Sequence, residues 1–394
     1  MTDTLTEGTD RPGTELGRFL LSNGSMSPDW VPAFNAVPRS LFVPDLAWVW
    51  DEKYGRSMVI DRASNVAGWL EAVSSNVPIV TQWDDGQHVG NEPGRVSTSS
   101  TSQPNVVMSM LRDLDVRPGM RVLEAGTGTG WNCGLLAHRL GSLQVVSVEV
   151  DPNVAARAQA ALQRAGVSPE VVTGDGQLGW PKGGPYDRII CTYGVRQIPR
   201  GWIRTTQTGG IILAPWGTAY GHRDAVVKLT VDDDEIASGH FTQLTGFMQD
   251  RGSRTPFPEH SAYVPEFPGD ADTAHITTRT ADDLGHDWDI RRFFLGLAVP
   301  DVTHVIHHQD DDTTTAWFYG LTDKSWAAVV WRKDQPETTV YQAGPRRLWQ
   351  AVERALDWWE ASGRPGIQRF GLTVAHGEQT AWLDKPGNLV PLQM

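Results

Sequence analysis

VLEAGTGTGW, residues 122–131, decides the fold of this chain. A short apolar run ends with the acid Glu124 and an alanine, and three glycines then alternate with two threonines. Glycine lets the backbone turn sharply and approach a ligand closely, and the first turn of a helix presents N–H groups that lack partners. The stretch therefore predicts a tight turn from a strand into a helix, shaped around a bound ligand.

The spacing of the glycines distinguishes two classes of ligand. A dinucleotide site requires G-x-G-x-x-G, but the position of its third glycine is occupied by Trp131. The pattern here is E-x-G-x-G-x-G, from Glu124 to Gly130. Without a pyrophosphate to hold, the turn favours the amino-acid part of a nucleoside ligand. The alternative, a turn that only packs helix on strand, is disfavoured because neighbouring elements agree in order and spacing.

Two acids downstream extend the expected site. Glu149 ends the second apolar run, 23 residues after Gly126, where a carboxylate can accept hydrogen bonds from both ribose hydroxyls. Asp175, in the GDG stretch 174–176, follows the third run and can accept a hydrogen bond from the exocyclic amine of adenine. Three acids beside a glycine turn suit a cationic nucleoside better than a phosphate. We therefore expect S-adenosylmethionine, whose sulfonium is positively charged.

Short apolar runs alternate with helical patterns around this stretch, which predicts a parallel, doubly wound, Rossmann-like sheet. Together with the expected S-adenosylmethionine site, this sheet resembles that of the class I methyltransferases. The expected helices are 104–114, 131–141 and 152–166. The expected strands are 120–126, 144–150, 170–175, 186–194 and 209–217, with two further strands within 224–244 that would pair antiparallel at one edge.

The rest of the chain divides by composition. Residues 1–15 are expected to be a disordered tail, and residues 16–250 an α/β domain with an irregular insertion at 46–95 that holds a short hairpin near residue 80. A segment rich in Pro, Gly and charge, 251–275, is expected to be a linker. Residues 276–394 are expected to form a C-terminal α+β domain that recognises peptide. Its predicted elements are strands at 302–308, 314–320, 325–332 and 338–344, a helix at 346–363 and a closing pair of strands in 369–384.

Composition excludes several classes of function. A formal net charge of −13 argues against a nucleic-acid partner. No apolar run approaches the length that spans a membrane, and the polar N-terminus does not resemble a targeting signal, so a cytoplasmic location is expected. The two cysteines show no metal-type spacing, and HHQDDD (307–312) is better explained as a charged hairpin tip than as a metal site.

Several stretches together resemble the protein-L-isoaspartate O-methyltransferase family, in that family's order and over roughly residues 30–250. They are PRSLFVPD (38–45), SSTSQP (99–104), VLEAGTGTG (122–130), SVEVD (147–151), GDG (174–176), YDRIICT (186–192), QIP (197–199) and GGIILAPWG (209–217). The glycine turn alone would indicate only a methyltransferase, whereas the TSQP element makes the resemblance specific. It implies methylation of a peptide carboxylate with S-adenosylmethionine.

The resemblance also implies roles for residues. Ser102 matches the active-site serine of the family's T-I-S-x-P motif, and Thr101 lies beside it. Because a carboxylate with a pKa near ~4 is already ionised at neutral pH, a hydroxyl that orients it suffices and no base is needed. The alternative role of Ser102 is to cap the helix at Pro104. The expected cofactor-binding residues are Ser100, Thr101, Ser102, Glu124, Gly126, Thr127, Gly128, Thr129, Gly130, Glu149, Val150, Asp175 and Gly176.

Three departures from the family pattern suggest a different peptide substrate. They are the insertion at 46–95, the altered segment 216–229 with His222 and Arg223, and the C-terminal domain, which is expected to have no counterpart in the repair enzymes. These features are similar to methyltransferases that tailor ribosomally made peptides such as lanthipeptides, where an aspartate is methylated and collapses to aspartimide or isoaspartate. The alternatives are an isoaspartate repair enzyme and an inactive cofactor-binding scaffold.

The altered segment supplies two candidate substrate-binding residues. Arg223 is expected to pair with a carboxylate of the substrate; the alternative is a surface ion pair with Asp224. His222 lies beside it in the sequence; a structural or solvent-exposed role is favoured for its side chain, and proton transfer is the alternative.

Overall fold

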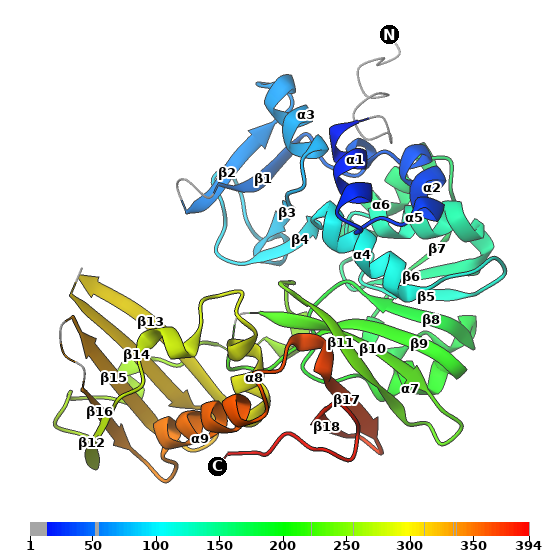
Figure 1. Ribbon diagram of the computed structural model, residues 1–394. Coiled ribbons are helices and arrows are strands. Elements are labelled where there is room, and N and C mark those ends of the chain that lie inside the picture. The colour runs from blue at the N-terminus through cyan, green and yellow to red at the C-terminus, as the bar shows by residue number, and fades with distance from the viewer. Residues whose placement is uncertain are drawn as a thin grey trace. The chain divides into compact units, whose positions relative to one another are not determined.

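The structure, a computed structural model, describes the chain except for residues 1–13, 52–54, 222, 255, 311, 334, 336 and 394. Figure 1 shows the arrangement of its elements. The chain forms two compact units. The first comprises the residues up to Tyr193 together with Pro199–Ala214 and Thr230–Ala237, and the second comprises Gly194–Ile198, Pro215–Leu229 and the residues from Ser238 onward. The predicted tail lies almost wholly outside the described residues.

The helices of the described residues are α1 (Glu15–Ser22), α2 (Val31–Ala36), α3 (Val66–Ser74), α4 (Pro104–Leu114), α5 (Trp131–Leu140), α6 (Pro152–Arg164), α7 (Arg200–Thr205), α8 (Ile290–Ala298) and α9 (Leu348–Ala361). The strands are β1 (Leu46–Asp51), β2 (Arg56–Asp61), β3 (Ile79–Trp83), β4 (Ser97–Thr101), β5 (Val122–Ala125), β6 (Val145–Glu149), β7 (Glu170–Thr173), β8 (Tyr186–Cys191), β9 (Thr206–Trp216), β10 (Asp224–Val231), β11 (Ala237–Thr245), β12 (Thr273–Thr277), β13 (Val302–Asp310), β14 (Thr313–Gly320), β15 (Trp326–Arg332), β16 (Thr338–Ala343), β17 (Phe370–Ala375) and β18 (Glu378–Leu383).

The largest sheet of the described residues has the order β18-β17-β11-β10-β9-β8-β5-β6-β7. Its strands β7, β6, β5, β8 and β9 run parallel, as the alternation of apolar runs and helices predicts. Every residue of β5 and of β6 is buried, because parallel strands with crossover helices are covered on both faces. The α/β fold of the class I methyltransferase type is therefore confirmed.

The described residues of the insertion at 46–95 form regular helices and strands, which corrects the expectation of an irregular segment with one short hairpin. Strands β1 to β3 form an antiparallel sheet with β4, in the order β2-β1-β3-β4, and helix α3 connects β2 to β3. The buried ring of Trp69 on α3 packs with Ala47 and Ile79 in a small core of its own. The strands are hard to recognise in the sequence because most of their side chains are only half-buried, so apolar and polar residues do not alternate cleanly.

The C-terminal residues form a third sheet, which is antiparallel and has the order β12-β16-β15-β14-β13, and the four strands predicted between 302 and 344 are confirmed. Two features differ from expectation. Strand β12 falls at the end of the segment predicted as a linker, and helix α8 has no counterpart in the prediction. The predicted closing pair, β17 and β18, is antiparallel but joins the largest sheet beside β11.

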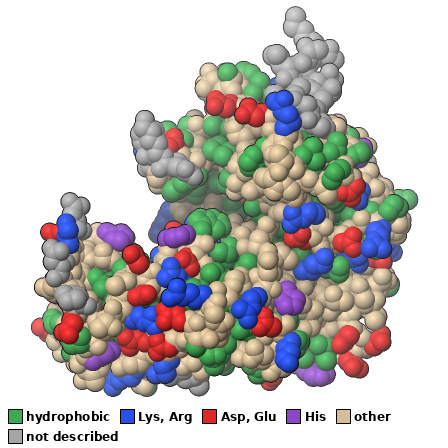
Figure 2. Space-filling model, viewed as in Figure 1, with side chains coloured by type: hydrophobic (Ala, Val, Ile, Leu, Met, Phe, Trp, Pro, Cys, Tyr) green, Lys and Arg blue, Asp and Glu red, His purple; other side chains and the backbone are tan. Residues whose placement is uncertain are grey.

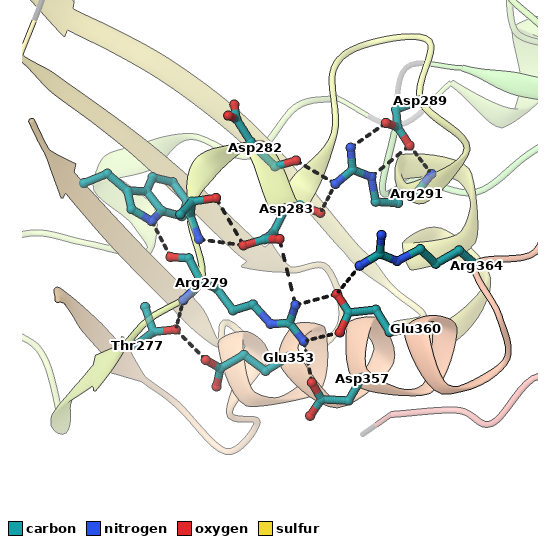
Figure 3. A network of polar contacts seen from close by, with 12 residues as sticks. Thr277, Arg279, Asp282, Asp283, Asp289, Arg291, Glu353, Asp357, Glu360 and Arg364 are labelled. Carbon is teal, nitrogen blue, oxygen red and sulfur yellow. Dashed lines mark hydrogen bonds and ion pairs between the residues drawn. The ribbon is translucent and has the colours of Figure 1, made fainter. Parts of the chain in front are cut away.

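A network of ion pairs connects segments of this second unit (Figure 3). Arg279 donates a hydrogen bond to Glu360 on α9 at 2.9 Å and another to Asp357, one turn away on the same helix. Arg291 on α8 pairs with Asp289, and it also donates to the backbone carbonyl of Asp282 at 2.7 Å. The network fastens α9 to the turn that precedes α8, so its role is to hold this unit together.

The outer surface carries charges of both signs. On the face shown in Figure 2, Lys and Arg side chains lie beside Asp and Glu side chains. Among the described residues, none of the helices combines the length and the apolar composition that crossing a bilayer requires.

Candidate active site

The predicted cofactor residues follow the carboxyl ends of neighbouring parallel strands. Strand β5 lies between β6 and β8, and all three run in the same direction. The order of the sheet therefore reverses beside β5, and ligands of such sheets bind in the crevice outside the carboxyl ends at this point. The glycine turn follows β5, Glu149 ends β6, and Asp175 comes two residues after β7.

Gly126 begins the turn in a conformation that favours glycine, with a φ of +94°. A Cβ atom at this position would lie 2.6 Å from Oγ1 of Thr192 and 2.7 Å from the ring of Tyr193. The backbone nitrogen of Gly126 donates to the carbonyl of Val148 on β6 at 2.8 Å. The turn is thus fixed against its neighbours in the sheet, and it packs this closely against Thr192 and Tyr193 only because position 126 carries no side chain.

Glu149 fastens the middle of the turn. One oxygen of its carboxylate accepts a hydrogen bond from the backbone nitrogen of Gly128 at 2.8 Å, and the other accepts one from the backbone nitrogen of Asp151 at 3.1 Å. Its side chain is largely buried, with 7% exposed. Glu149 therefore lies against the turn, as the predicted cofactor site requires.

Glu124 lies deeper than the prediction of direct cofactor contact assumed. Its side chain is fully buried, and its carboxylate accepts hydrogen bonds from Asn132 at 2.7 Å and from Ser147. The hydroxyls of Ser147 and Thr127 share a further hydrogen bond of 2.5 Å. Burial raises the pKa of Glu124 to about 7. Glu124 is therefore the innermost residue of a polar network that ends in the glycine turn.

The residues after β6 and β7 differ in exposure. Val150 is 52% exposed, and Asp175 is exposed while its carboxylate accepts a hydrogen bond from the backbone of Gln177. Gly176 is buried, and a Cβ atom there would lie 3.0 Å from the hydroxyl of Tyr193. Tyr193, which follows β8, thus lies against both Gly126 and Gly176, although the sequence analysis assigned it no role.

The predicted hydroxyl residues lie on and directly after β4. The hydroxyl of Thr101 donates to the hydroxyl of Thr129 in the glycine turn at 3.2 Å, which brings the TSQP element and the turn together. Ser100 is half-buried, and its backbone oxygen would lie 3.5 Å from a Cβ atom at Gly128. Gln103 occupies the N-cap position of α4, although its side chain makes no capping hydrogen bond to the helix, so the alternative role of Ser102 as helix cap is wrong.

Arg39 supports this strand and was missed as a functional residue. Its guanidinium is fully buried and donates to the backbone carbonyls of Thr101 at 3.1 Å and Ser102 at 3.2 Å. It also donates to three carbonyls that follow or end α3, those of Val73, Ser75 and Val77. The signal was present in the PRSLFVPD stretch, because an arginine between apolar residues must find many acceptors if it is buried.

The candidate substrate residues belong to the second unit. His222 lies outside the described residues. The guanidinium of Arg223 lies 4.3 Å from the ring of Trp288 and 3.9 Å from the carboxylate of Asp287. Asp224, the partner expected in the alternative interpretation, is instead bound to Arg196 at 2.6 Å and to Gln249 at 2.9 Å. The expected ion pair between Arg223 and Asp224 is therefore wrong, because the buried carboxylate of Asp224 binds Arg196 and Gln249 instead.

Comparison with known proteins identifies the family. A family model described as Protein-L-isoaspartate(D-aspartate) O-methyltransferase (PCMT) matches residues 16–245, which is more than half of the chain. The chain belongs to the PCMT family. The resemblance inferred from the sequence motifs is thereby confirmed at the level of the family.

Individual PCMT relatives match in part. The protein-L-isoaspartate O-methyltransferase of Pyrococcus horikoshii is 36% identical over 148 residues, which are 37% of this chain and 67% of that protein. The protein-L-isoaspartate O-methyltransferase 1 of an Anaeromyxobacter species is 32% identical over 209 residues, 52% of this chain and 81% of that protein. Across the first four relatives, the chain spans between 52% and 67% of their length. None of these names refers to a ribosomally made peptide.

A solved structure of a protein-L-isoaspartate O-methyltransferase has a similar fold, with a TM-score of 0.53 at 22% identity. The match covers 94% of this chain and 99% of that one. The part of this chain that lies outside the match is much shorter than residues 276–394, so the match includes most of these residues. The expectation that the C-terminal domain has no counterpart in such enzymes is therefore wrong.

The PCMT family uses S-adenosylmethionine, and the residues of this chain fit that cofactor. The bend at Gly126 admits no side chain, because Thr192 and Tyr193 pack directly against it, and this fixes the course of the turn. Glu149 and Asp175 supply negative charge and hydrogen-bond acceptors beside it, as a cationic nucleoside requires.

Proposed function

We propose that this chain transfers a methyl group from S-adenosylmethionine to the carboxylate of an isoaspartyl residue in a peptide or protein. The main support is that one family match spans both the glycine turn and strand β4 with its hydroxyl side chains. The contact between Thr101 and Thr129 joins these two elements. The proposal corresponds to the alternative that the sequence analysis kept beside a peptide-tailoring enzyme.

Each part of the site receives a role in this proposal. Glu149 binds the ribose hydroxyls, Asp175 binds the adenine, and the glycine turn, with Thr127 and Thr129, lies along the amino-acid part. Glu124 acts through the turn as a positioning residue. Ser102 donates a hydrogen bond that orients the acceptor carboxylate, and Arg39 holds the backbone of residues 101 and 102 in place for it.

The cofactor supplies, when bound, a methyl group on a positively charged sulfur. The substrate carboxylate would accept this group without a proton transfer, because it is already ionised at neutral pH. Aligning the oxygen with the carbon–sulfur bond and excluding water are therefore the tasks of the protein. The methyl ester releases methanol more readily than the acid releases hydroxide. The neighbouring backbone nitrogen therefore attacks the ester carbonyl, gives up its proton and expels methanol to close a succinimide, which water then opens.

A second candidate is an aspartate side chain in a ribosomally made precursor peptide as the methyl acceptor, with aspartimide or isoaspartate as the product. The observation that favours it is the sheet formed by the insertion, which pairs directly with β4 and extends the surface beside Ser102. Arg223 and His222 would bind the substrate in this candidate. A cytoplasmic location, expected from the sequence, remains a prediction for both candidates.

One incubation distinguishes the two. The full-length protein with S-adenosylmethionine is given an isoaspartyl peptide, its aspartyl counterpart, or precursor peptides encoded beside its gene, and mass spectrometry follows the gain of a methyl group and the loss of water. Methylation of the isoaspartyl peptide supports the first candidate. Methylation of a precursor aspartate alone supports the second. Cofactor binding without methylation of any of them would contradict both and favour a scaffold.

A further inference from the structure

The first unit contains a pocket of ≈ 590 Å³ that no assigned role explains. It is bounded by residues of the PRSLFVPD stretch, by the insertion, by Ser99 of β4 and by one face of α6. Gly128 and Thr129 of the glycine turn also line it, whereas Glu149 and Asp175 do not. The pocket therefore adjoins the cofactor site but is built largely by other residues.

Aromatic side chains from the insertion form one wall. The ring of Trp48 on β1 meets the ring of Trp83 at the end of β3 edge-on, with centroids 6.0 Å apart, and meets the His88 ring at 6.2 Å. The indole nitrogen of Trp48 donates to the carbonyl of Asn91 at 2.7 Å, which fixes its ring. Such a rigid aromatic wall favours a flat or branched apolar side chain.

The lining of the pocket contains no Asp or Glu among the described residues, although the chain carries a net charge of −13. It contains two arginines, Arg157 and Arg164, on the face of α6 that also carries Val154 and Ala161. Arg164 donates to the carbonyl of Leu41 at 2.8 Å. No acidic partner of Arg157 is found in the part of the chain that the structure describes. The charge of the pocket is therefore complementary to a carboxylate.

Two buried nitrogen atoms of the aromatic wall also lack a hydrogen-bond partner within the described residues. They are Nε1 of Trp83, whose side chain is only 8% exposed, and Nε2 of His88. A buried polar nitrogen without a partner is costly, so such atoms commonly mark a place where a ligand or water completes the structure.

We propose that this pocket binds an apolar side chain together with an adjacent carboxylate of the acceptor peptide. The inference rests on the proposed function, because it assigns the peptide's flanking residues to the pocket. Ser99, which lines the pocket, precedes Ser102 by three residues, a span of at most about 10 Å. An extended peptide covers that span in about three residues. The preferred substrate thus has an apolar residue beside an acidic one, about three positions from the methylated residue.

Two pairs of variants test the inference. Ala160 on α6 is exposed and lines the pocket, so Ala160→Trp fills it, whereas Ala156→Trp places the same side chain on the same helix outside the pocket. Arg157→Gln removes the unpaired charge, with the exposed Arg204→Gln on α7 as its control. Isoaspartyl peptides that carry Phe-Glu, Ser-Glu, Phe-Gln or Ser-Gln three residues from the acceptor are the substrates.

With the unaltered chain, we expect the Phe-Glu peptide to have a KM about tenfold lower than that of the Ser-Gln peptide, with little change in kcat. Ala160→Trp should abolish this preference, and Arg157→Gln should raise the KM of the Phe-Glu peptide by about two- to fivefold without affecting the Phe-Gln peptide. Neither control should change either KM. Affinity for S-adenosylhomocysteine, measured by calorimetry, should be the same in all five proteins.

Three results would overturn the inference: equal KM values for the four peptides, the same losses in the control variants, or a weaker affinity for S-adenosylhomocysteine in Ala160→Trp, which would make the pocket part of the cofactor site. Failure of the proposed function has a different signature. If no peptide is methylated, fluorescence anisotropy of the labelled peptides with S-adenosylhomocysteine present still tests the pocket. Binding of the Phe-Glu peptide that Ala160→Trp abolishes would support the inference, and no binding would refute it.

Discussion

The backbone nitrogen of Gly128 donates a hydrogen bond to the carboxylate of Glu149 across 2.8 Å. This contact joins the glycine turn after β5 to the end of β6, so one side chain shapes the turn and carries the negative charge that lies nearest to it. A ligand that uses the same carboxylate must share it with the turn. Binding of the cofactor and the conformation of the turn are therefore expected to depend on each other.

Glu149→Gln is the most direct test of this relationship. The amide oxygen can still accept the hydrogen bond from Gly128, but the charge and one of the two acceptor oxygens are lost. Hydrogen bonds to charged groups contribute about 1.5–3 kcal/mol, so the affinity for S-adenosylhomocysteine should fall by roughly tenfold or more. Calorimetry measures this, with the exposed Glu170→Gln on β7 as the control. An unchanged affinity would exclude Glu149 from the cofactor site.

Gly126→Ala should abolish cofactor binding through lack of space. A non-glycine residue in the left-handed region costs roughly 1–2 kcal/mol, and here the added methyl group would also meet Thr192 at 2.6 Å. Gly141 has the same φ of +94° but no atom within 4 Å, so Gly141→Ala isolates the backbone cost. We expect both variants to lose stability in urea unfolding but only Gly126→Ala to lose S-adenosylhomocysteine binding. Equal losses in both would show that space at position 126 is unimportant.

Ser102→Ala should slow methyl transfer without weakening cofactor binding. The hydroxyl orients the acceptor carboxylate in the proposed function, and a hydrogen bond to a charged group contributes about 1.5–3 kcal/mol. We therefore expect kcat to fall by about tenfold to a hundredfold, whereas the affinity for S-adenosylhomocysteine stays the same. Steady-state kinetics with an isoaspartyl peptide measures this, and Ser97→Ala at the other end of β4 is the control. A normal kcat would remove Ser102 from the mechanism.

The sequence predicted the parts of the fold whose residues are buried on both faces. Helix α4 was predicted with the correct ends, because its apolar residues recur at helical spacing and Pro104 occupies its first turn. The parallel strands were found for a similar reason, since β5 and β6 are wholly buried and therefore mostly apolar, with the polar exceptions Glu124, Ser147 and Glu149 in the site. The sheet of the insertion was missed because its strands are only half-buried.

Site residues could be predicted where they belong to a recognisable sequence motif. They could not be predicted where segments distant in the sequence bring them to the site. Gly126 and Glu149 follow from spacing along the chain. In contrast, Tyr193 contacts Gly126 only because β8 lies beside β5, and that neighbourhood is a property of the sheet order. The depth of Glu124 has the same origin, since burial depends on the helices that cover β5. The pairing of β17 with β11 depends on residues more than a hundred positions apart.

Arg39→Met should destabilise the first unit strongly. The guanidinium donates to the carbonyls of Val73, Ser75, Val77, Thr101 and Ser102. Methionine fills the volume but leaves buried carbonyls without donors, which costs on the order of 3 kcal/mol. The stability of Arg39→Lys should lie between that of the unaltered chain and that of Arg39→Met, because an ammonium has fewer donors than a guanidinium and a different geometry. Urea unfolding measures the loss, with the exposed Arg18→Met on α1 as the control. A loss no larger than that of the control would contradict the supporting role of Arg39.

Glu124→Gln should change how stability depends on pH. Burial raises the pKa of Glu124 from 4.5 to about 7, so between these values the folded protein holds a proton that the unfolded chain releases. The contribution of this group therefore falls as pH rises through that window and is constant above it. Unfolding free energies at pH 5 and pH 8 should show the unaltered chain losing roughly 3 kcal/mol relative to Glu124→Gln. The exposed Glu71→Gln on α3 should leave the difference between the two pH values unchanged. If the unaltered chain and Glu124→Gln change in parallel, the buried carboxyl does not titrate in this window and the network beneath the turn is ionised throughout.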